Sequence, residues 1–250
     1  MNRQVNRYIR RIGDVVMLVG ALAFLTPVVS GQFGPPPGPP KAPKAAAPID
    51  LTGYWVSIVS EDWRFRMVVP PKGDYPDFLL TPDGKKIADA WDPAKDEAEK
   101  DHCKAYGAPN IMRVPGRFHI TWSDDNTLKI ETDAGTQTRL LRFAAPGRTT
   151  AAGPPTRQGT SVAQWERNSL RVETSNLLPG YLQYNGVPFS SNLKMVEYFD
   201  VIREPGGEVW LIDDAVLTDP MFLVRSHKRS THLRKQADAS GWDPQPCLVR

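Results

Sequence analysis

Residues 193–217, LKMVEYFDVIREPGGEVWLIDDAVL, carry the clearest fold signal in this chain. Two runs rich in β-branched and aromatic residues, 193–202 and 208–217, flank the turn-forming tripeptide Pro205-Gly206-Gly207. Apolar and polar side chains alternate along both runs, which is the period of a β-strand with one face in a core. The stretch therefore predicts an antiparallel hairpin.

Short runs of the same kind recur along the chain, separated by Gly, Pro, Asn and Asp. We expect strands at 54–60, 63–69, 117–122, 127–132, 136–143, 160–165, 169–175, 193–202, 208–217 and 222–233. About ten strands joined mostly by tight turns predict a mainly β, antiparallel up-and-down barrel of the lipocalin-like type, because closure removes exposed strand edges. A two-sheet β-sandwich is the alternative. Thr81-Pro82 and Asp92-Pro93 predict the starts of two short helices, 82–90 and 93–104, which form a helical insertion.

The chain divides into three parts. Residues 1–31 combine four arginines, an apolar run at 15–25 and small residues at Ser30 and Gly31, a pattern typical of a cleavable signal peptide. Residues 32–49 form a Pro-rich linker, and residues 50–250 form a single β-barrel domain. We therefore expect a periplasmic or secreted protein that meets a membrane only during export. The ordinary secretory route is favoured, with the twin-arginine route as an alternative because of Arg10-Arg11.

The distribution of charge argues against a nucleic-acid partner. The whole chain has a formal net charge of +3, and residues 1–31, with four Arg and one Asp, account for +3 by themselves. The chain that remains after cleavage is formally neutral. No nucleic-acid partner is therefore expected.

The chain has two cysteines, Cys103 and Cys247. An even number of cysteines in an exported chain predicts a disulfide, which would tie the C-terminal tail to the body of the domain. The alternative is a metal site that uses His102 and Cys103. Because no second cysteine stands close to Cys103 in the sequence, the pattern favours the disulfide.

Several motifs of the mature chain resemble a known group of proteins. They are LTPDGKKIADAWDP at 80–93, leading to Cys103 and Gly107, then SVAQWE at 161–166 with LRVETSNL at 170–177, and VEYF at 196–199 with LTDP at 217–220. These motifs are similar to those of secreted bacterial β-rich proteins described as calycin-like or lipocalin-like, a family without an agreed activity. The resemblance implies export and a barrel fold, and it implies no particular chemistry.

Two carboxylates interrupt apolar rows in the hairpin. Glu197 stands in the row of residues 193, 195, 199 and 201, and Asp214 stands in the row of residues 210, 212 and 216. If the hairpin turns on residues 204–207, Glu197 faces Asp214 and both point into the barrel. Two buried carboxylates need a raised pKa or a nearby cation, and Arg139 is the candidate cation. The group is either a functional site or a buried structural ion network, and the sequence favours the structural role.

The remaining candidate site residues are a histidine and a set of tryptophans. His119 is a third candidate acid or base, although it alternates with polar residues on the expected strand 117–122. Five tryptophans on expected strands are candidate ligand-binding residues, namely Trp55, Trp63, Trp122, Trp165 and Trp210. Aromatic side chains lining a barrel would favour an apolar ligand, while ordinary core packing is the simpler role for any one of them.

The sequence carries no diagnostic catalytic motif. A Gly-x-Ser-x-Gly elbow, a glycine-rich phosphate loop and a His-x-x-x-His zinc pattern are all missing from it, and we expect neither cofactor nor metal. The first hypothesis is a barrel that binds a hydrophobic or aromatic small molecule in its interior, with Glu197, Asp214 and Arg139 as polar anchors. One alternative is a cofactor-independent lyase, isomerase or hydrolase that uses a carboxylate or histidine of the same cavity. The other is an interaction module of the cell envelope.

Overall fold

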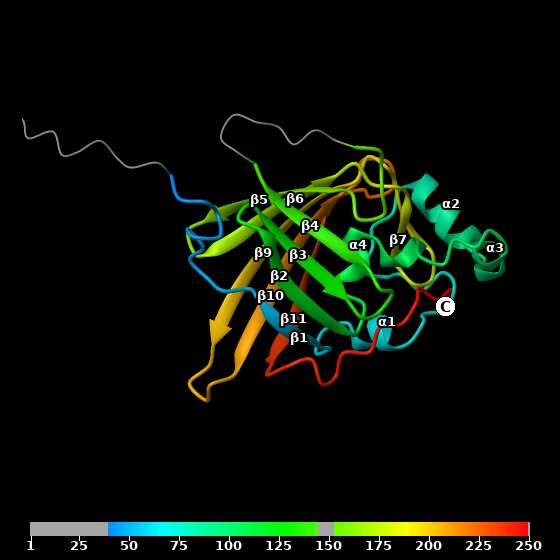
Figure 1. The fold of residues 1–250 in the computed structure, drawn as a ribbon. Coiled ribbons are helices and arrows are strands. Elements are labelled where there is room, and N and C mark those ends of the chain that lie inside the picture. The colour runs from blue at the N-terminus through cyan, green and yellow to red at the C-terminus, as the bar shows by residue number, and fades with distance from the viewer. Residues whose placement is uncertain (1–39, 145–152, 250) are drawn as a thin grey trace, which may run out of the picture. The chain divides into compact units, whose positions relative to one another are not determined.

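The computed structural model describes residues 40–144 and 153–249, and these form a mainly β domain built around a closed barrel. Nine strands make the barrel in the order β1-β11-β10-β9-β6-β5-β4-β3-β2 (Figure 1). They are β1 Gly53–Ile58, β2 Arg117–Asp124, β3 Thr127–Thr132, β4 Thr138–Phe143, β5 Thr160–Glu166, β6 Ser169–Ser175, β9 Lys194–Arg203, β10 Val209–Thr218 and β11 His227–Gln236. The expected barrel is thus confirmed. The expected signal peptide and most of the linker lie outside the described residues.

The barrel is mixed, not wholly antiparallel as the sequence predicts. Strands β4 and β5 pair in parallel, with Leu141 opposite Ser161, while the other neighbouring strands pair antiparallel. A parallel pair needs a connection long enough to bring the chain back to the same end of the sheet. Residues 144–159 separate these two strands, so this junction is no tight turn.

A helical insertion with its own small sheet accompanies the barrel. Its elements are α2 Pro82–Ala90, α3 Pro93–Ala98, a short 3₁₀ helix η1 Lys104–Tyr106, α4 Ala108–Ile111, and the two-stranded sheet β7 Gly180–Gln183 with β8 Val187–Phe189. Figure 1 shows α2 and α3 beside β7. Both helices begin at the expected prolines, and the side chains of Thr81 and Asp92 cap them. Among the described residues, none of the helices is long and apolar enough to span a membrane.

One expected strand is a helix. Residues 63–69 were expected to be extended, but α1 occupies Trp63–Met67. Trp63 is 62% exposed, while Arg66 is buried and donates from Nε to the carbonyl of Arg113 at 2.9 Å. In so short a run, strand and helix periods cannot be separated from the sequence, and the contacts of Arg66 decide the conformation.

Side chains fill the interior of the barrel. Its hydrophobic cluster includes Trp55, Phe118, Leu211 and Leu233, all at most 1% exposed. A second cluster, which includes Phe189, joins the helical insertion to the barrel wall. Interiors packed in this way leave little room for a guest molecule.

The disulfide between Cys103 and Cys247 is present, as the sequence predicts. It joins the residue just before η1 to the C-terminal tail. The same tail lies against the barrel, since Gln245 donates its backbone N–H to the carbonyl of Asp133 at 2.8 Å. The bond therefore fastens the tail to the helical insertion.

Candidate functional site

Arg139 and Glu197 form an ion pair in the middle of the barrel. The two side chains are each about 1% exposed, and Arg139 donates from Nη1 and Nη2 to Oε1 and Oε2 of Glu197 at 2.9 and 2.7 Å. Nη2 also lies 3.4 Å from Oγ1 of Thr174, which is hydrogen-bonded to Ser161. The inward orientation of both charged residues, and their pairing, agree with the sequence prediction. A two-point guanidinium–carboxylate contact fixes both groups in one geometry.

The expected orientation of Asp214 is wrong, because Asp213 takes the interior position. Glu197 lies opposite Ala215 instead of Asp214, and Asp214 is exposed. The turn is one residue longer than expected, because Arg203 pairs with Val209 instead of Glu208. Within the turn, the backbone N–H of Glu204 donates to the carbonyl of Glu208, and Gly207 adopts a φ of 91°. A shift of one residue moves every side chain of a strand to the other face.

Asp213 is a buried acid beside this ion pair. It is 2% exposed, and its Oδ1 has no hydrogen-bond partner among the described residues. Burial raises the pKa of Asp213 well above its ordinary value, the nearby Glu197 raises it further, and Arg139 opposes both effects. One guanidinium therefore lies near two buried carboxyl groups, and only Glu197 is paired with it directly.

His119 lies far from this group in the architecture of the barrel. On β2 the buried residues are Phe118 and Ile120, so His119 points to the outer face. Its ring stacks on Tyr54 with centroids 4.1 Å apart, and Nδ1 lies 3.5 Å from Glu131. The structure does not bring His119 together with Glu197.

The five candidate tryptophans do not line one cavity. Trp55 is fully buried in the core, and its indole donates to the carbonyl of Leu51. Trp122 and Trp165 both pack against Phe143, with ring centroids 5.7 and 5.4 Å from it. Trp63 is exposed on α1, and Trp210, being adjacent to the inward-facing Leu211, lies on the outer face of β10.

The structure has a ligand-sized groove outside the barrel, which we call the α2–α3 groove. Its volume is about 560 Å³, within the range of small-molecule sites. Its lining combines apolar and aromatic side chains with charged ones, namely Ile87, Ala90, Trp91, Tyr181, Phe222, Asp83, Lys86, Asp92, Lys95, Asp96, Glu99 and Lys104. The sequence analysis missed this site. The available signal was Trp91 placed between two helices that each begin with proline.

Three hydrogen-bonded side chains, Tyr181, Asp96 and Lys104, form a polar part of this groove. The hydroxyl of Tyr181 donates to the carboxylate of Asp96 at about 3.0 Å, and Nζ of Lys104 donates to the same carboxylate at 2.5 Å. Burial, followed by the bond to Asp96, raises the pKa of Tyr181. Burial by itself lowers the pKa of Lys104, but its bonds to Asp96 and Glu99 outweigh this and raise it. The tyrosine is therefore a neutral donor at physiological pH, and the lysine is a fixed cation.

Gly186 allows the ring of Trp91 to pack closely against the backbone of the β7–β8 turn. It lies in the β7–β8 turn with a φ of 80°, and a Cβ atom built on it would lie 2.1 Å from Cγ of Trp91. Only glycine combines this backbone conformation with such close approach of an indole ring. The position of Trp91 in the groove thus depends on the turn.

In comparisons with known proteins, no protein-family model matches this chain, and no curated protein matches it significantly in sequence.

Proposed function

We propose that this protein is an exported β-barrel protein that binds a hydrophobic or aromatic small molecule in the α2–α3 groove. The observation that carries the proposal is the groove itself, about 560 Å³ in volume and lined by Trp91, Tyr181 and Phe222. Half-buried aromatic side chains that line a groove of this size offer a flat guest a large apolar contact area. The packed interior of the barrel supports an outer site over an inner one.

The polar groups of the groove favour a particular kind of guest. Lys86, Lys95 and Lys104 line the groove beside its apolar surface. Four carboxylates line it as well: Asp96 and Glu99 pair with Lys104, Asp92 caps α3, and Asp83 is the fourth. Because lysines and carboxylates nearly balance, an uncharged flat apolar molecule with one polar substituent matches the lining best.

Export is the second part of the proposal. The signal-like composition of residues 1–31 supports it, and so does the disulfide, because such bonds persist mainly outside the reducing cytoplasm. A groove of this kind on an exported protein would receive compounds from the surroundings of the cell.

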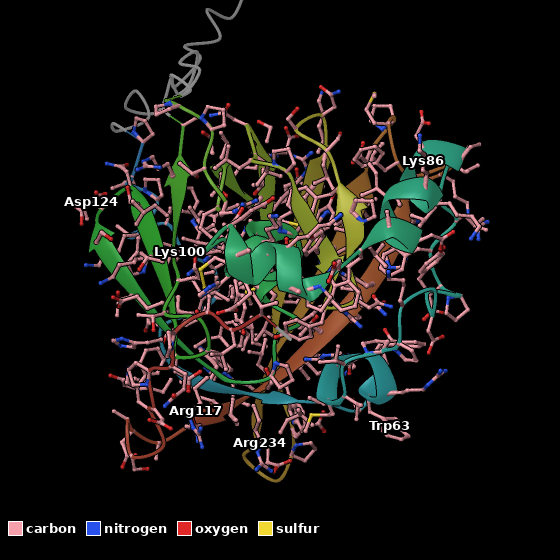
Figure 2. The ribbon with its side chains drawn as sticks, turned by 90° about the vertical axis from the view of Figure 1, so that its right-hand side faces the viewer. Trp63, Lys86, Lys100, Arg117, Asp124 and Arg234 are labelled. Atoms are coloured by element: carbon pink, nitrogen blue, oxygen red, sulfur yellow. A yellow bond between two sulfur atoms is a disulfide. The ribbon has the colours of Figure 1, made fainter. Side chains whose placement is uncertain are left out.

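Fluorescence titration with N-phenyl-1-naphthylamine, an uncharged aromatic probe, tests the binding proposal. The wild-type protein should enhance the emission of the probe at saturating occupancy, and Trp91→Ala should weaken its affinity about tenfold, or ~1.4 kcal/mol. Trp63→Ala is the matched control, because Trp63 is exposed on α1 and does not line the groove. Figure 2 shows Trp63 well apart from Lys86 of the groove.

Two results would overturn the proposal. One is equal loss of affinity in Trp63→Ala and Trp91→Ala, which would indicate general adsorption of the probe. The other is unchanged binding in Trp91→Ala, which would place the probe elsewhere.

Native mass spectrometry of the purified secreted protein adds an independent test, since a retained apolar compound would identify the class of natural ligand.

A further inference from the structure

A second, much smaller cavity lies under α1, between this helix, α4, β7 and the start of β11. Its volume is about 30 Å³. The side chains around it include two arginines, Arg66 and Arg113, together with Asn110, Gln183 and His227. A cavity of this volume admits a species about the size of a water molecule.

Arg66 presents an unused hydrogen-bond donor at this cavity. The residue is 3% exposed, Nε donates to the carbonyl of Arg113, and Nη1 pairs with Glu61. Its Nη2 is buried and has no hydrogen-bond partner among the described residues. A buried guanidinium N–H without an acceptor is costly, so an acceptor bound in the cavity would be stabilising.

Two further guanidinium groups stand close to Arg66. Arg113 donates to Asp62 at 2.7 Å and lines the same cavity. Arg229 lies two positions after His227 on the inner face of β11, opposite Ala215 of β10. Its Nη1 is buried and has no hydrogen-bond partner among the described residues. Asp213 and Glu197 act on Arg229 only through space. Burial, followed by the charge of Arg113, lowers the pKa of Arg229 to about 9.

Three carboxylates stand against the three guanidinium groups, but Arg229 has no direct ion partner among the described residues. Glu61 is engaged by Arg66, and Asp62 is engaged by Arg113. Asp77 also lines the cavity, and the buried Asp213 acts on Arg229 through space. His227 adds no charge at neutral pH, since burial lowers its pKa to about 4.

We propose that this cavity binds one monatomic inorganic anion, of the chloride class, with Nη2 of Arg66 as its main hydrogen-bond donor and with Arg113 and Arg229 supplying positive charge. The anion would accept the unused hydrogen bond and offset the repulsion among the three guanidinium groups. The small volume favours a halide over a phosphate or sulfate. The site is separate from the α2–α3 groove, and the proposal does not depend on the proposed function.

The anion dependence of thermal unfolding tests this site on the whole protein. Sodium chloride is compared with sodium gluconate at equal ionic strength, because gluconate is too large for the cavity. A ligand that binds only the folded state raises its stability by mass action, so the midpoint should rise about 3 °C more in chloride once the concentration reaches roughly ten times Kd. An equal midpoint in the two salts would overturn the proposal.

A charge-conserving pair of variants locates the effect. Arg66→Lys keeps the charge but removes the Nη2 donor, whereas Arg64→Lys changes an exposed arginine of the same helix that pairs with Asp74. The chloride-specific shift should vanish in Arg66→Lys and persist in Arg64→Lys. If Arg66→Lys does not fold, the ³⁵Cl NMR signal of chloride is recorded with and without the wild-type protein. Broadening of this signal that added bromide reverses supports the site, whereas no broadening shows that the cavity holds only water. A chloride-specific rise of the midpoint that Arg66→Lys retains overturns the assignment to Arg66.

Discussion

Arg139 pairs with Glu197 inside the barrel and also lowers, through space, the pKa that burial and Glu197 raise at Asp213. Arg139→Ala should therefore destabilise the fold by about 3 kcal/mol or more, because it leaves a buried carboxylate without a cation. Urea unfolding at neutral pH measures this. The double variant Arg139→Met with Glu197→Leu is the control, and it should recover most of the loss. A wild-type midpoint for Arg139→Ala would show that the ion pair is dispensable.

His227 should make stability depend on pH. Burial, followed by Arg229 and Arg113, lowers its pKa from 6.5 to about 4, so the unfolded chain takes up a proton between these values and the folded chain does not. The contribution of His227 to the free energy of unfolding is thus fully present above pH 6.5, and it is lost as the pH falls toward 4.

The variant His227→Phe keeps the ring contact with Phe78, whose centroid lies 4.3 Å away, and removes the titration. Between pH 7.5 and pH 5, the wild type should lose about 1 kcal/mol more of its unfolding free energy than this variant, after allowance for the half-buried ring. Urea unfolding at the two pH values compares them. Parallel losses would show that His227 titrates normally in the folded state.

The sequence could predict the inward orientation of one carboxylate of the hairpin, but it could not predict the other. The alternation around Glu197 was unambiguous, and the structure confirms its inward orientation. Asp213 and Asp214 are adjacent, so the pattern of β10 allowed either to face inward. The choice depended on the length of the turn at 204–208, which composition alone does not determine.

Among the elements, the β7–β8 turn is the one that positions the groove. Gly186→Ala would force its Cβ toward the ring of Trp91 at a backbone conformation that alanine disfavours, so it should weaken probe binding about tenfold. Gly206→Ala is the matched control, because a Cβ there meets no atom within 4 Å. Titration with N-phenyl-1-naphthylamine compares the two. Equal affinities would show that the turn does not hold Trp91 in place.

Elements with strong local signals were predictable, while α1 and the groove were not. Thr81-Pro82 and Asp92-Pro93 carry capping chemistry that is visible in the sequence, and α2 and α3 begin at these prolines. The conformation of α1 depends on the bond from Arg66 to Arg113, residues distant in the sequence. The groove likewise needs Tyr181 to lie against α3, which no local pattern indicates.

For the whole molecule, the disulfide closes a loop of 144 residues. The double variant Cys103→Ser with Cys247→Ser should lose about 4 kcal/mol of stability, since the oxidised unfolded chain has much less conformational entropy. Urea unfolding measures the difference. Thiol titration of the denatured, unreduced wild type should find no free thiol, and two reactive thiols would contradict the bond.

The closed barrel itself was predictable because its turn signals recur at short intervals along the chain. The parallel pairing of β4 with β5 was not, because the connection at 144–159 carries no pattern that sets strand direction. The ligand site could not be located from the sequence either. The lipocalin-like barrel expected from the sequence suggests an inner cavity, but the inward side chains of this barrel are packed against one another.

The most direct test of the groove as the ligand site is a ¹⁵N-correlated NMR spectrum of the tryptophan indoles, recorded with and without N-phenyl-1-naphthylamine. The chain has seven tryptophans, each assignable by a single Trp→Phe variant. The cross-peak of Trp91 should shift on addition of the probe, while those of the buried Trp55 and of Trp165, whose indole donates to the carbonyl of Pro43, should stay in place. Shifts of Trp55 or Trp165 with an unmoved Trp91 would place the ligand in the barrel and contradict the account.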